Sequence, residues 1–515
     1  MSGALPHGWI EVELIDHVYI AGRIGWRGLK AEEYTASGPI LLSVPNLNHG
    51  NEVDFSKVNY ISRARYDESP EIQLKVGDTL LVKDGAGIGK LGYVARLPGK
   101  ATVNSSLLVV RPSDRLLSAK YLFYYLKGPQ MQGIAIQRIT GSATPHLFQK
   151  DIRHFRILVP PVQEQQRIVA KLDKLSETTD ACLARLAKMS TLLGRFRQSV
   201  LSSAFSGRLT ADWRRMHIKS ESGIAFLPLL KQRLLAAARN EREAARVCRF
   251  FDPARLATAA DEVGFDLPES WTACCIGTVG HVCNGSTPSR KEPAFWGGNI
   301  PWISSGEVRN NIISSTREQV SQAGFEGSSL RKLPPGTVLL AMIGEGKTRG
   351  QSAILQIEAT INQNVAAVIT GHGLVVPKFL WRWFQFQYQS TRERGGGSGP
   401  QALNCERVRE IPFALPPPEE QEEIVRRLEA LLQFADRVEA RHAKAKERTN
   451  MLTMSILAKA FQGKLTEQNP SDDPASVLLE CIREARLPQT QPRSKRKPAS
   501  RRANSSFLQS EKTIV

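Results

Sequence analysis

Long apolar runs are missing from this sequence of 515 residues. No stretch approaches the roughly 18 consecutive apolar residues that a membrane-spanning helix needs. The opening residues Met1-Ser2-Gly3-Ala4-Leu5 have neither the basic nor the apolar region of a secretion signal. The seven cysteines are scattered and form no CxxC pair, so neither a disulfide framework nor a zinc site is predicted. We therefore expect a soluble, cytoplasmic protein.

Motifs of the common catalytic sites are missing as well. There is no HExxH, no Gly-x-Ser-x-Gly turn and no Asn/Asp-Pro-Pro-Tyr/Phe loop of the kind that holds a flipped adenine. The segment 341–348 ends in Gly-Lys-Thr like a phosphate-binding loop, but Ala341 stands where that motif needs its first glycine. We instead expect a tight glycine hairpin here and around Gly89-Lys90, with each lysine free to meet a DNA phosphate. The sequence predicts no catalytic residue, no metal site and no cofactor in this chain.

Acidic residues are too few to balance the basic ones. Asp and Glu number 50 against 69 Lys and Arg, which leaves a net charge of +19. An excess of this size favours a polyanionic partner, with nucleic acid as the first candidate and an anionic membrane surface as the second. The chain is also too long for one hydrophobic core, and its length predicts about two to four domains.

What the sequence does contain is one stretch that occurs twice. Adding 256 to each residue number carries residues 141–210 onto 397–466 without a gap. Among the matches, Pro160-Pro161 falls on Pro416-Pro417 and Glu164-Gln165 falls on Glu420-Gln421. A register kept over roughly 70 residues indicates an internal duplication rather than chance similarity, so we expect two copies of one structural unit.

Each copy predicts a long helix. Prolines, which cannot sit inside a helix, are followed by acidic residues in the first turn, and Gly207 or Gly463 ends the segment. A helix of about 42 residues is roughly 60 Å long. Apolar residues recur at alternating steps of four and three, which is typical of a coiled-coil seam, and we expect the two copies to pair. The predicted seam comprises Ile168, Leu172, Leu175, Leu186, Leu193, Ile424, Leu428, Leu431, Leu452 and Ile456.

The second copy of the seam is weaker in its middle, because residues 435–449 are polar or small at the seam positions. A compact bundle of ordinary helices is the alternative interpretation of both copies. A strict heptad pattern of this length favours the coiled coil.

Segments of roughly 150 residues, the size of a domain, precede both helices. Both open with Leu-Pro-x-x-Trp, which ends at Trp9 and Trp271, and both contain a similar strand and turn, whereas the loops between these parts differ. We predict a shared scaffold that carries two different surfaces. The expected parts are a first domain at 1–159, its helix at 160–213, a connector at 214–265 with a helix from about 227 to 246, a second domain at 266–415, its helix at 416–468, and a short helix with a basic disordered tail at 469–515.

Side chains able to bind DNA gather in the divergent loops and at the ends of the predicted strands. Arg, Lys, Asn, Gln and Ser can donate to or accept from base edges and phosphates, although each residue is also open to a role as an ordinary loop residue, and the tryptophans to a role in the core. The candidates in the first domain are Arg23, Trp26, Arg27, Asn46, Asn48, His49, Lys90, Asn104, Ser105 and His146. Those in the second are Thr287, Ser289, Arg290, Lys291, Trp302, Ser304, Ser305, Lys347, Arg349, Asn362, Gln363, Asn364 and Gln401.

These features resemble the specificity (S) subunits of type I restriction-modification enzymes, and most closely their type IA branch. The resemblance is carried by the Pro-Pro-x-x-Glu-Gln-x-x-Ile-Val openings at Pro160 and Pro416, by the helix ends at 195–213 and 455–466, and by the duplicated order of domain and helix. It implies an α+β fold with two mixed α/β target-recognition domains in tandem repeat. Two long helices, which form an antiparallel coiled coil, would separate them. Each domain would read one half of a split site in double-stranded DNA.

The resemblance also implies partners. Two modification (M) subunits would methylate adenine with S-adenosylmethionine, and two restriction (R) subunits would use ATP and Mg to translocate and cleave DNA. The chain itself would then be non-catalytic. Two other classes stay open: a self-contained DNA methyltransferase or nuclease, which needs a cofactor loop, and a coiled-coil adaptor that binds DNA without sequence preference.

Overall fold

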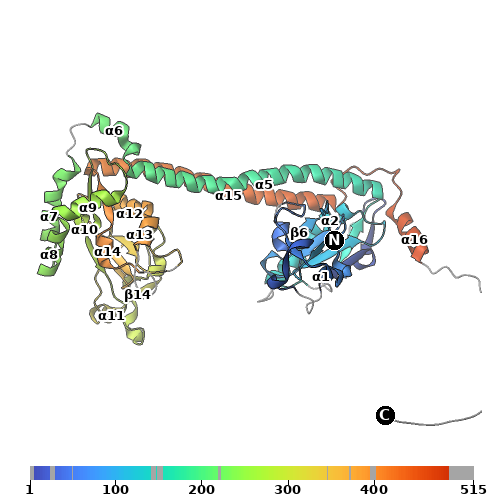
Figure 1. Cartoon of the computed structure of the whole chain (residues 1–515), viewed down its shortest axis with the longest axis horizontal. Coiled ribbons are helices and arrows are strands. Elements are labelled where there is room, and N and C mark those ends of the chain that lie inside the picture. Colours follow the sequence, from blue (N-terminus) through green and yellow to red (C-terminus); the bar gives the residue numbers. More distant parts are fainter. Residues whose placement is uncertain are drawn as a thin grey trace, which may run out of the picture. The chain divides into compact units, whose positions relative to one another are not determined.

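The structure is a computed structural model that describes residues 5–23, 29–48, 50–140, 146–147, 155–217, 222–344, 346–370, 373–394 and 402–486. The chain divides into two compact units, Met1–Ala184 with Glu447–Val515 and Arg185–Lys446. Each unit contains one of the two predicted domains together with part of each long helix (Figure 1). Among the described residues, no helix combines the length and the apolar character that crossing a membrane requires.

The first unit is built on two small sheets. The four-stranded sheet is antiparallel and has the order β2 (Val18–Gly22), β8 (Leu107–Pro112), β5 (Thr79–Val82), β6 (Leu91–Tyr93). The second sheet has the order β4 (Asn59–Ile61), β3 (Tyr34–Leu42), β7 (Ala101–Val103), in which β3 and β7 run parallel. All four side chains of β5 are buried, which explains why three apolar residues follow Thr79 without alternating with polar ones.

The other elements of this unit close the domain. Strands β1 (Ile10–Glu13) and β9 (Arg156–Val159) form a separate antiparallel pair. The helices are α1 (Arg63–Asp67), α2 (Ala119–Lys127), α3 (Pro129–Thr140) and α16 (Ala475–Arg486). Helix α16 confirms the short helix predicted near the C-terminus, and it buries Ala475 and Leu479 in the same core as α2.

The second unit repeats this frame. Its larger sheet has the order β11 (His281–Asn284), β18 (Val365–Ile369), β15 (Val338–Ala341), β16 (Ser352–Leu355), β13 (Asn311–Ile313). Its smaller sheet has the order β14 (Glu318–Val320), β12 (Trp296–Ile303), β17 (Thr360–Ile361), and β12 and β17 are parallel as β3 and β7 are. A separate pair, β10 (Thr272–Cys275) with β19 (Pro412–Leu415), matches β1 with β9. The helices of this domain are α10 (Ile276–Val279), α11 (Gln322–Glu326), α12 (Pro377–Phe386), α13 (Tyr388–Glu393) and α14 (Cys405–Arg409).

The connector differs from the prediction of one helix over 227–246. After α6 (Ala211–Met216), the chain forms α7 (Leu227–Ala236), α8 (Glu241–Phe250) and α9 (Pro253–Val263). Helix α8 begins anew because the Asn240 side chain accepts a hydrogen bond from the backbone N–H of Glu243 at 3.0 Å, which is an N-cap. Leu230 and Leu234 of α7 and Phe250 of α8 are buried, so the connector packs onto the second domain instead of standing apart from it.

The two long helices are α5 (Val162–Phe205) and α15 (Pro418–Ala460), with 44 and 43 residues, close to the predicted length. They lie side by side and antiparallel within each unit (Figure 1). In the first unit, Cys182 Sγ lies 4.0 Å from Thr449 Oγ1; in the second, Leu186 O is 2.7 Å from His442 Nε2, and Arg197 Nη2 is 2.7 Å from Asp436 Oδ1. The pairing of the two copies is therefore confirmed.

The predicted seam is wrong at Leu452, whose side chain is 55% exposed. Thr453 and Leu457 line the helix pair instead, next to Leu172 and Leu175 of α5. The half-buried residues Ala445, Thr449 and Thr453 are separated by two successive steps of four residues. Such an irregularity, called a stutter, shifts the interface away from a strict heptad pattern. Of the other predicted positions, Ile168, Leu172, Leu193, Ile424 and Leu428 are buried, and Leu175, Leu186, Leu431 and Ile456 are half-buried.

The start of each long helix is clamped to its domain by the repeated Glu-Gln pair. Trp9 Nε1 donates to Glu164 at 2.9 Å, and Trp271 Nε1 donates to Glu420 at the same distance. Gln165 Nε2 donates to the backbone oxygens of residues 116 and 160, and its Oε1 accepts from the N–H of residue 118. Gln421 makes the equivalent bonds to residues 374, 416 and 376. These bonds explain why the Trp that opens each domain and the Glu-Gln that opens each helix occur together.

Candidate nucleic-acid interface

In the first domain, several candidate residues meet at the end of the sheet where β3 and β7 finish. Because these strands are parallel, their carboxyl ends lie at the same edge, and Asn104 N donates to Leu42 O at 2.9 Å there. The loop between β5 and β6 reaches the same edge, since Lys83 N donates to Ser106 O at 2.9 Å. The loop after β3, the turn after β7 and this hairpin loop together form what we call the first polar end, residues 43–48, 83–90 and 104–106.

The second domain builds its polar end in the same way. The loop after β12 and the turn after β17 start at neighbouring strand ends, and Asn362 N donates to Ile303 O at 3.0 Å. The loop between β15 and β16 joins them through Met342 N, which donates to Asn364 O at 2.9 Å. The loop after β11 lies beside them, because Gly285 N donates to Asn362 O at 3.3 Å. The second polar end thus comprises residues 284–291, 304–307, 342–351 and 362–364, without residue 345.

Two candidates of the first domain are structural residues rather than readers of DNA. Arg23 is only 4% exposed, and its Nε donates to Val103 O at 3.2 Å. Asn46 is also buried: its Oδ1 accepts from Ser43 N, and its Nδ2 donates to the backbone oxygens of Asp54 and Lys57. The prediction was wrong for both residues, because their polar groups hold the backbone of the fold together.

Three candidates of the second domain are buried in the same way. Trp302 is 2% exposed, packs with Ile300 and Val320, and donates its indole N–H to Ser286 O at 3.0 Å. Asn362 is 7% exposed, and its Oδ1 accepts from Asn364 N at 3.1 Å in a turn. Arg349 is 7% exposed. A bound duplex could not reach these side chains without a change of the domain, so the prediction was wrong for them.

The glycine hairpins exist but are not tight. Residues 83–90 connect β5 to β6, and residues 342–351 connect β15 to β16, so both loops are much longer than a two-residue turn. Lys90 is also not free, because its Nζ donates to Asn48 Oδ1 at 3.0 Å. Both residues are exposed, so the pair remains accessible to a ligand. Lys347 is exposed in the second loop.

The remaining candidates divide by accessibility. Ser289, Arg290, Lys291 and Gln363 are exposed, and Gln363 Oε1 accepts from the hydroxyl of Thr287 at 2.5 Å. Asn104 and Ser304 stabilise their own turns, through Ser106 N and Glu307 respectively, and His146 pairs with Asp84. Ser105, Ser305 and Asn364 are half-buried. Trp26, Arg27, His49 and Gln401 lie outside the described residues.

Sequence reasoning missed the residues that support Arg290. Glu318 on β14 accepts from Arg290 Nη1 and Nη2 at 2.5 and 2.9 Å, and the centre of the Trp296 ring lies 3.7 Å from the guanidinium carbon. The ion pair raises the pKa of Arg290 and lowers the pKa of Glu318. Glu318 lies 28 residues further along the chain, so no local pattern could have indicated this pair.

A family model described as "Type I restriction modification DNA specificity domain" matches this chain twice, at residues 37–188 and 268–446. The chain belongs to this family. The predicted resemblance to type I specificity subunits is therefore confirmed.

Individual relatives agree with the family model. The specificity subunit of the type I restriction enzyme EcoDI of Escherichia coli is 28% identical over 430 residues, which cover 78% of this chain and 83% of the relative. The EcoKI specificity subunit of Escherichia coli K12 is 24% identical over 513 residues, which cover 94% and 97%. A chain from a solved structure, titled as the basis of complex assembly and conformational transition of the type I R-M system, is 17% identical, covers 90% of this chain and all of its own length, and has a TM-score of 0.58. The predicted fold class is confirmed.

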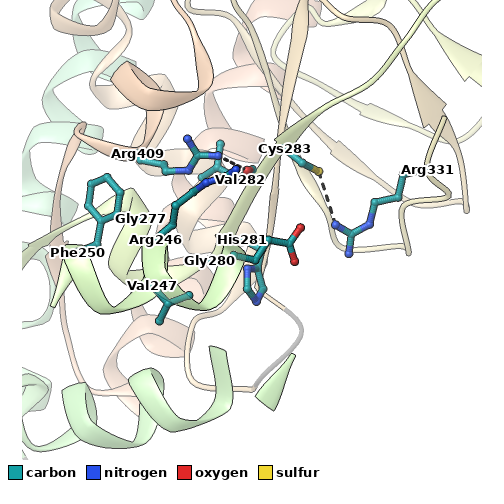
Figure 2. A pocket seen from close by; sticks show the side chains of 11 residues that line it. Arg246, Val247, Phe250, Gly277, Gly280, His281, Val282, Cys283, Arg331 and Arg409 are labelled. Atoms are coloured by element: carbon teal, nitrogen blue, oxygen red, sulfur yellow. Dashed lines mark hydrogen bonds between the residues drawn. The ribbon is translucent and has the colours of Figure 1, made fainter. Parts of the chain in front are cut away.

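A small hollow in this specificity subunit brings a cysteine and a histidine together, which raises the question of nucleophilic chemistry. The hollow has a volume of about 30 Å³ and lies between α8, α10 and β11 (Figure 2). Burial raises the pKa of the Cys283 thiol and lowers the pKa of His281, and His281 Nε2 lies 3.0 Å from Leu234 O rather than from the thiol. His281 uses its ring nitrogen on a backbone oxygen, and the neighbour of the Cys283 thiol is Arg331 Nη1 at 4.0 Å. A neutral thiol whose hydrogen-bond partner is a cation and not a base is not an activated nucleophile, so this hollow gives no support to the self-contained enzyme.

Proposed function

We propose that this chain reads a bipartite DNA site, with one half-site for each domain. The observation that carries this proposal is the polar end, which is built twice on the same strand frame from different side chains. The first domain offers Asn48 and Lys90 there, whereas the second offers Thr287, Gln363 and an arginine held by Glu318. Two domains with one frame and different polar surfaces fit the recognition of two different base sequences.

We further propose that the long helices separate the half-sites and carry the partner subunits. Helices of 44 and 43 residues extend about 65 Å at 1.5 Å per residue, which suits a spacer. In this proposal, two M subunits methylate one adenine in each half-site with S-adenosylmethionine, and two R subunits use ATP and Mg to translocate and cleave. This chain then supplies recognition and assembly and no catalytic residue, as in the type IA branch.

An exchange of domains tests modular reading. Residues 1–150 are replaced by the corresponding domain of a relative with a known site, and methylated adenines are mapped in cells that also produce the M subunit. We expect one half of the methylated site to change and the other half to stay. A change in both halves would contradict the assignment of one half-site to each domain.

A salt titration separates this proposal from a DNA-binding adaptor without sequence preference. For both, affinity falls as salt displaces the protein from phosphates. A reader keeps a ratio between its specific and nonspecific duplexes, typically about 10³-fold or more, whereas an adaptor binds all duplexes alike at each salt concentration. Equal affinity for the methylated site and for a scrambled duplex would refute the reading function.

A further inference from the structure

Two neighbours hold the guanidinium of Arg290 in one orientation. The two hydrogen bonds to Glu318, at 2.5 and 2.9 Å, form a bidentate pair that aligns the guanidinium with the carboxylate. On another side the group stacks on Trp296, with 3.7 Å between the guanidinium carbon and the ring centre. An exposed arginine normally occupies many rotamers, but these two contacts leave this one largely ordered before any ligand arrives.

The support is itself rigid. Trp296 begins β12, its Nε1 donates to Ser289 O at 3.2 Å, and its ring meets the buried ring of Trp302 edge-on at 5.1 Å. Glu318 begins β14, the strand that pairs with β12. Both groups that position Arg290 therefore stand on paired strands rather than on free loops, which is the arrangement that a precise binding site needs.

One edge of the guanidinium is left for a ligand. An arginine has five N–H donors, and Glu318 takes one from each terminal nitrogen. Among the described residues, no acceptor contacts the edge formed by Nε–H and the neighbouring second N–H. The Arg290 side chain is 52% exposed, so a ligand can reach it from solvent.

We propose that this edge reads a guanine in the half-site of the second domain, an inference that rests on the function proposed above. Guanine presents two adjacent acceptors, O6 and N7, in the major groove, and an arginine that donates to both is the commonest specific contact of this kind. Adenine presents a donor in place of O6, so the same edge would lose one hydrogen bond and meet a donor with a donor. Because Glu318 and Trp296 already order the side chain, little rotamer entropy is lost on binding.

The position of Arg290 fits this role. Its loop belongs to the second polar end, next to the accessible pair of Thr287 and Gln363. The following residue, Lys291, is also exposed, and none of the described acidic groups lies within ion-pair distance of it. We assign Lys291 a phosphate contact, because a lysine is a compact point charge without the planar fork that distinguishes bases. The two neighbours therefore provide a matched comparison.

The experiment uses the full chain in complex with its M subunit. Wild type, Arg290→Gln, Arg290→Lys and Lys291→Gln are compared by mapping methylated adenines and by competition binding with duplexes substituted at each position. The half-site of the second domain is first identified by exchanging residues 266–415. We expect both Arg290 variants to relax discrimination at one G·C position by about five- to 150-fold and to leave the other half-site unchanged. Lys291→Gln should weaken all sequences alike and lower the salt slope by about one.

Other outcomes overturn the inference. The inference fails if Arg290→Gln methylates the same site as the wild type, or if this variant loses affinity equally at all positions. It also fails if the half-site of the second domain contains no G·C pair. Glu318→Gln is an independent variant that keeps the arginine but weakens its support, and it should relax the same position by a smaller factor. Retention of the first half-site shows that each variant still folds and assembles. If the wild-type complex methylates no bipartite site, the proposed function itself fails. If the wild-type complex methylates a bipartite site and Arg290→Gln methylates the same site, only the inference about Arg290 fails.

Discussion

Glu164 and Glu420 occupy equivalent positions at the two helix starts, but only Glu420 accepts a hydrogen bond from an arginine among the described residues. Both carboxylates are buried, and each accepts from a tryptophan at 2.9 Å. Arg214 Nη2 donates to Glu420 Oε1 at 2.7 Å, whereas the position that the 256-residue repeat assigns to Arg214 in the other copy is Pro470. Among the described residues, no cation lies within ion-pair distance of Glu164, and burial raises the pKa of that carboxyl.

Replacing each glutamate with glutamine should therefore have unequal effects on stability. Removing one partner of a buried ion pair costs about 3–5 kcal/mol, because the other charge is left without compensation. The side chain of Arg214 is 23% exposed and can regain some water, so we expect Glu420→Gln to cost about 2–3 kcal/mol. Glu164→Gln keeps an oxygen that accepts from Trp9 and removes a charge that burial disfavours, so we expect a gain of between zero and about 1 kcal/mol.

Hydrogen exchange of the full chain at neutral pH measures both effects. A loss of 2 kcal/mol corresponds to exchange that is about 30-fold faster, and we expect it at the amides of β10 and of the first turns of α15 in Glu420→Gln. The amides of β1 and of the first turns of α5 should exchange at the wild-type rate or more slowly in Glu164→Gln. In each variant, the unit without the substitution is the internal control.

The pH dependence gives the result that would refute this reasoning. Since the folded pKa of Glu164 is raised, the stability linked to its protonation is fully present below its ordinary value of 4.5 and is lost as the pH rises through the folded pKa. The advantage of Glu164→Gln should thus be absent below pH 4.5 and appear toward neutral pH. Equal destabilisation by the two substitutions at neutral pH would show that the arginine is not what separates the two sites.

Three further predictions concern the helices. Leu172→Ala should lower the free energy of unfolding by about 2–5 kcal/mol, because Leu172 is only 2% exposed. Leu452→Ala should lower it by less than about 0.5 kcal/mol, because Leu452 is 55% exposed. Equal losses in chemical unfolding would contradict the corrected seam. Asp212 pairs with Arg427, and Glu423 pairs first with Arg426 and then with Arg427; these ion pairs lower the pKa of both carboxyls to about 2. The second unit should therefore lose stability as the pH falls from about 4 toward 2, and in an acid titration Arg427→Gln should remove the part of this loss that comes from Asp212 and keep most of the part that comes from Glu423. Removing seven residues from each helix at the facing segments 183–189 and 440–446 should shorten the gap of the methylated site by about three base pairs, because seven residues span about 10.5 Å; an unchanged gap would refute the spacer.

The duplication made most of the fold predictable. A gap-free repeat that contains a heptad pattern indicates two domains and two paired helices without knowledge of any contact. The errors occurred at two places where a single residue decides whether a pattern continues or stops. Leu452 was placed in the seam by extending the heptad through a stutter, and the break between α7 and α8 was overlooked although Asn240 is a residue that often caps helices.

The candidate site was predictable as a region but not residue by residue. Strand ends followed by Asn, Ser and Lys indicated the polar ends, and both proved to gather several loops. A polar residue in such a loop can either face a ligand or satisfy the buried backbone, and the sequence does not distinguish these roles. Arg23 donates to a carbonyl 80 residues away, while Arg290 pairs with a carboxylate 28 residues away and stays exposed. Only the tertiary structure separates the two arginines.

The chemistry of the clamps explains how one frame can carry two different surfaces. Gln165 and Gln421 bind backbone carbonyl and amide groups, which every residue type supplies, and each opening tryptophan binds a glutamate that belongs to the helix itself. No side chain of the polar ends takes part in these bonds. Substitutions in the polar ends therefore leave the attachment of the domain to its helix intact, so recognition can change while the anchorage remains. This separation is the physical reason to expect that an exchanged domain will bring its own half-site with it.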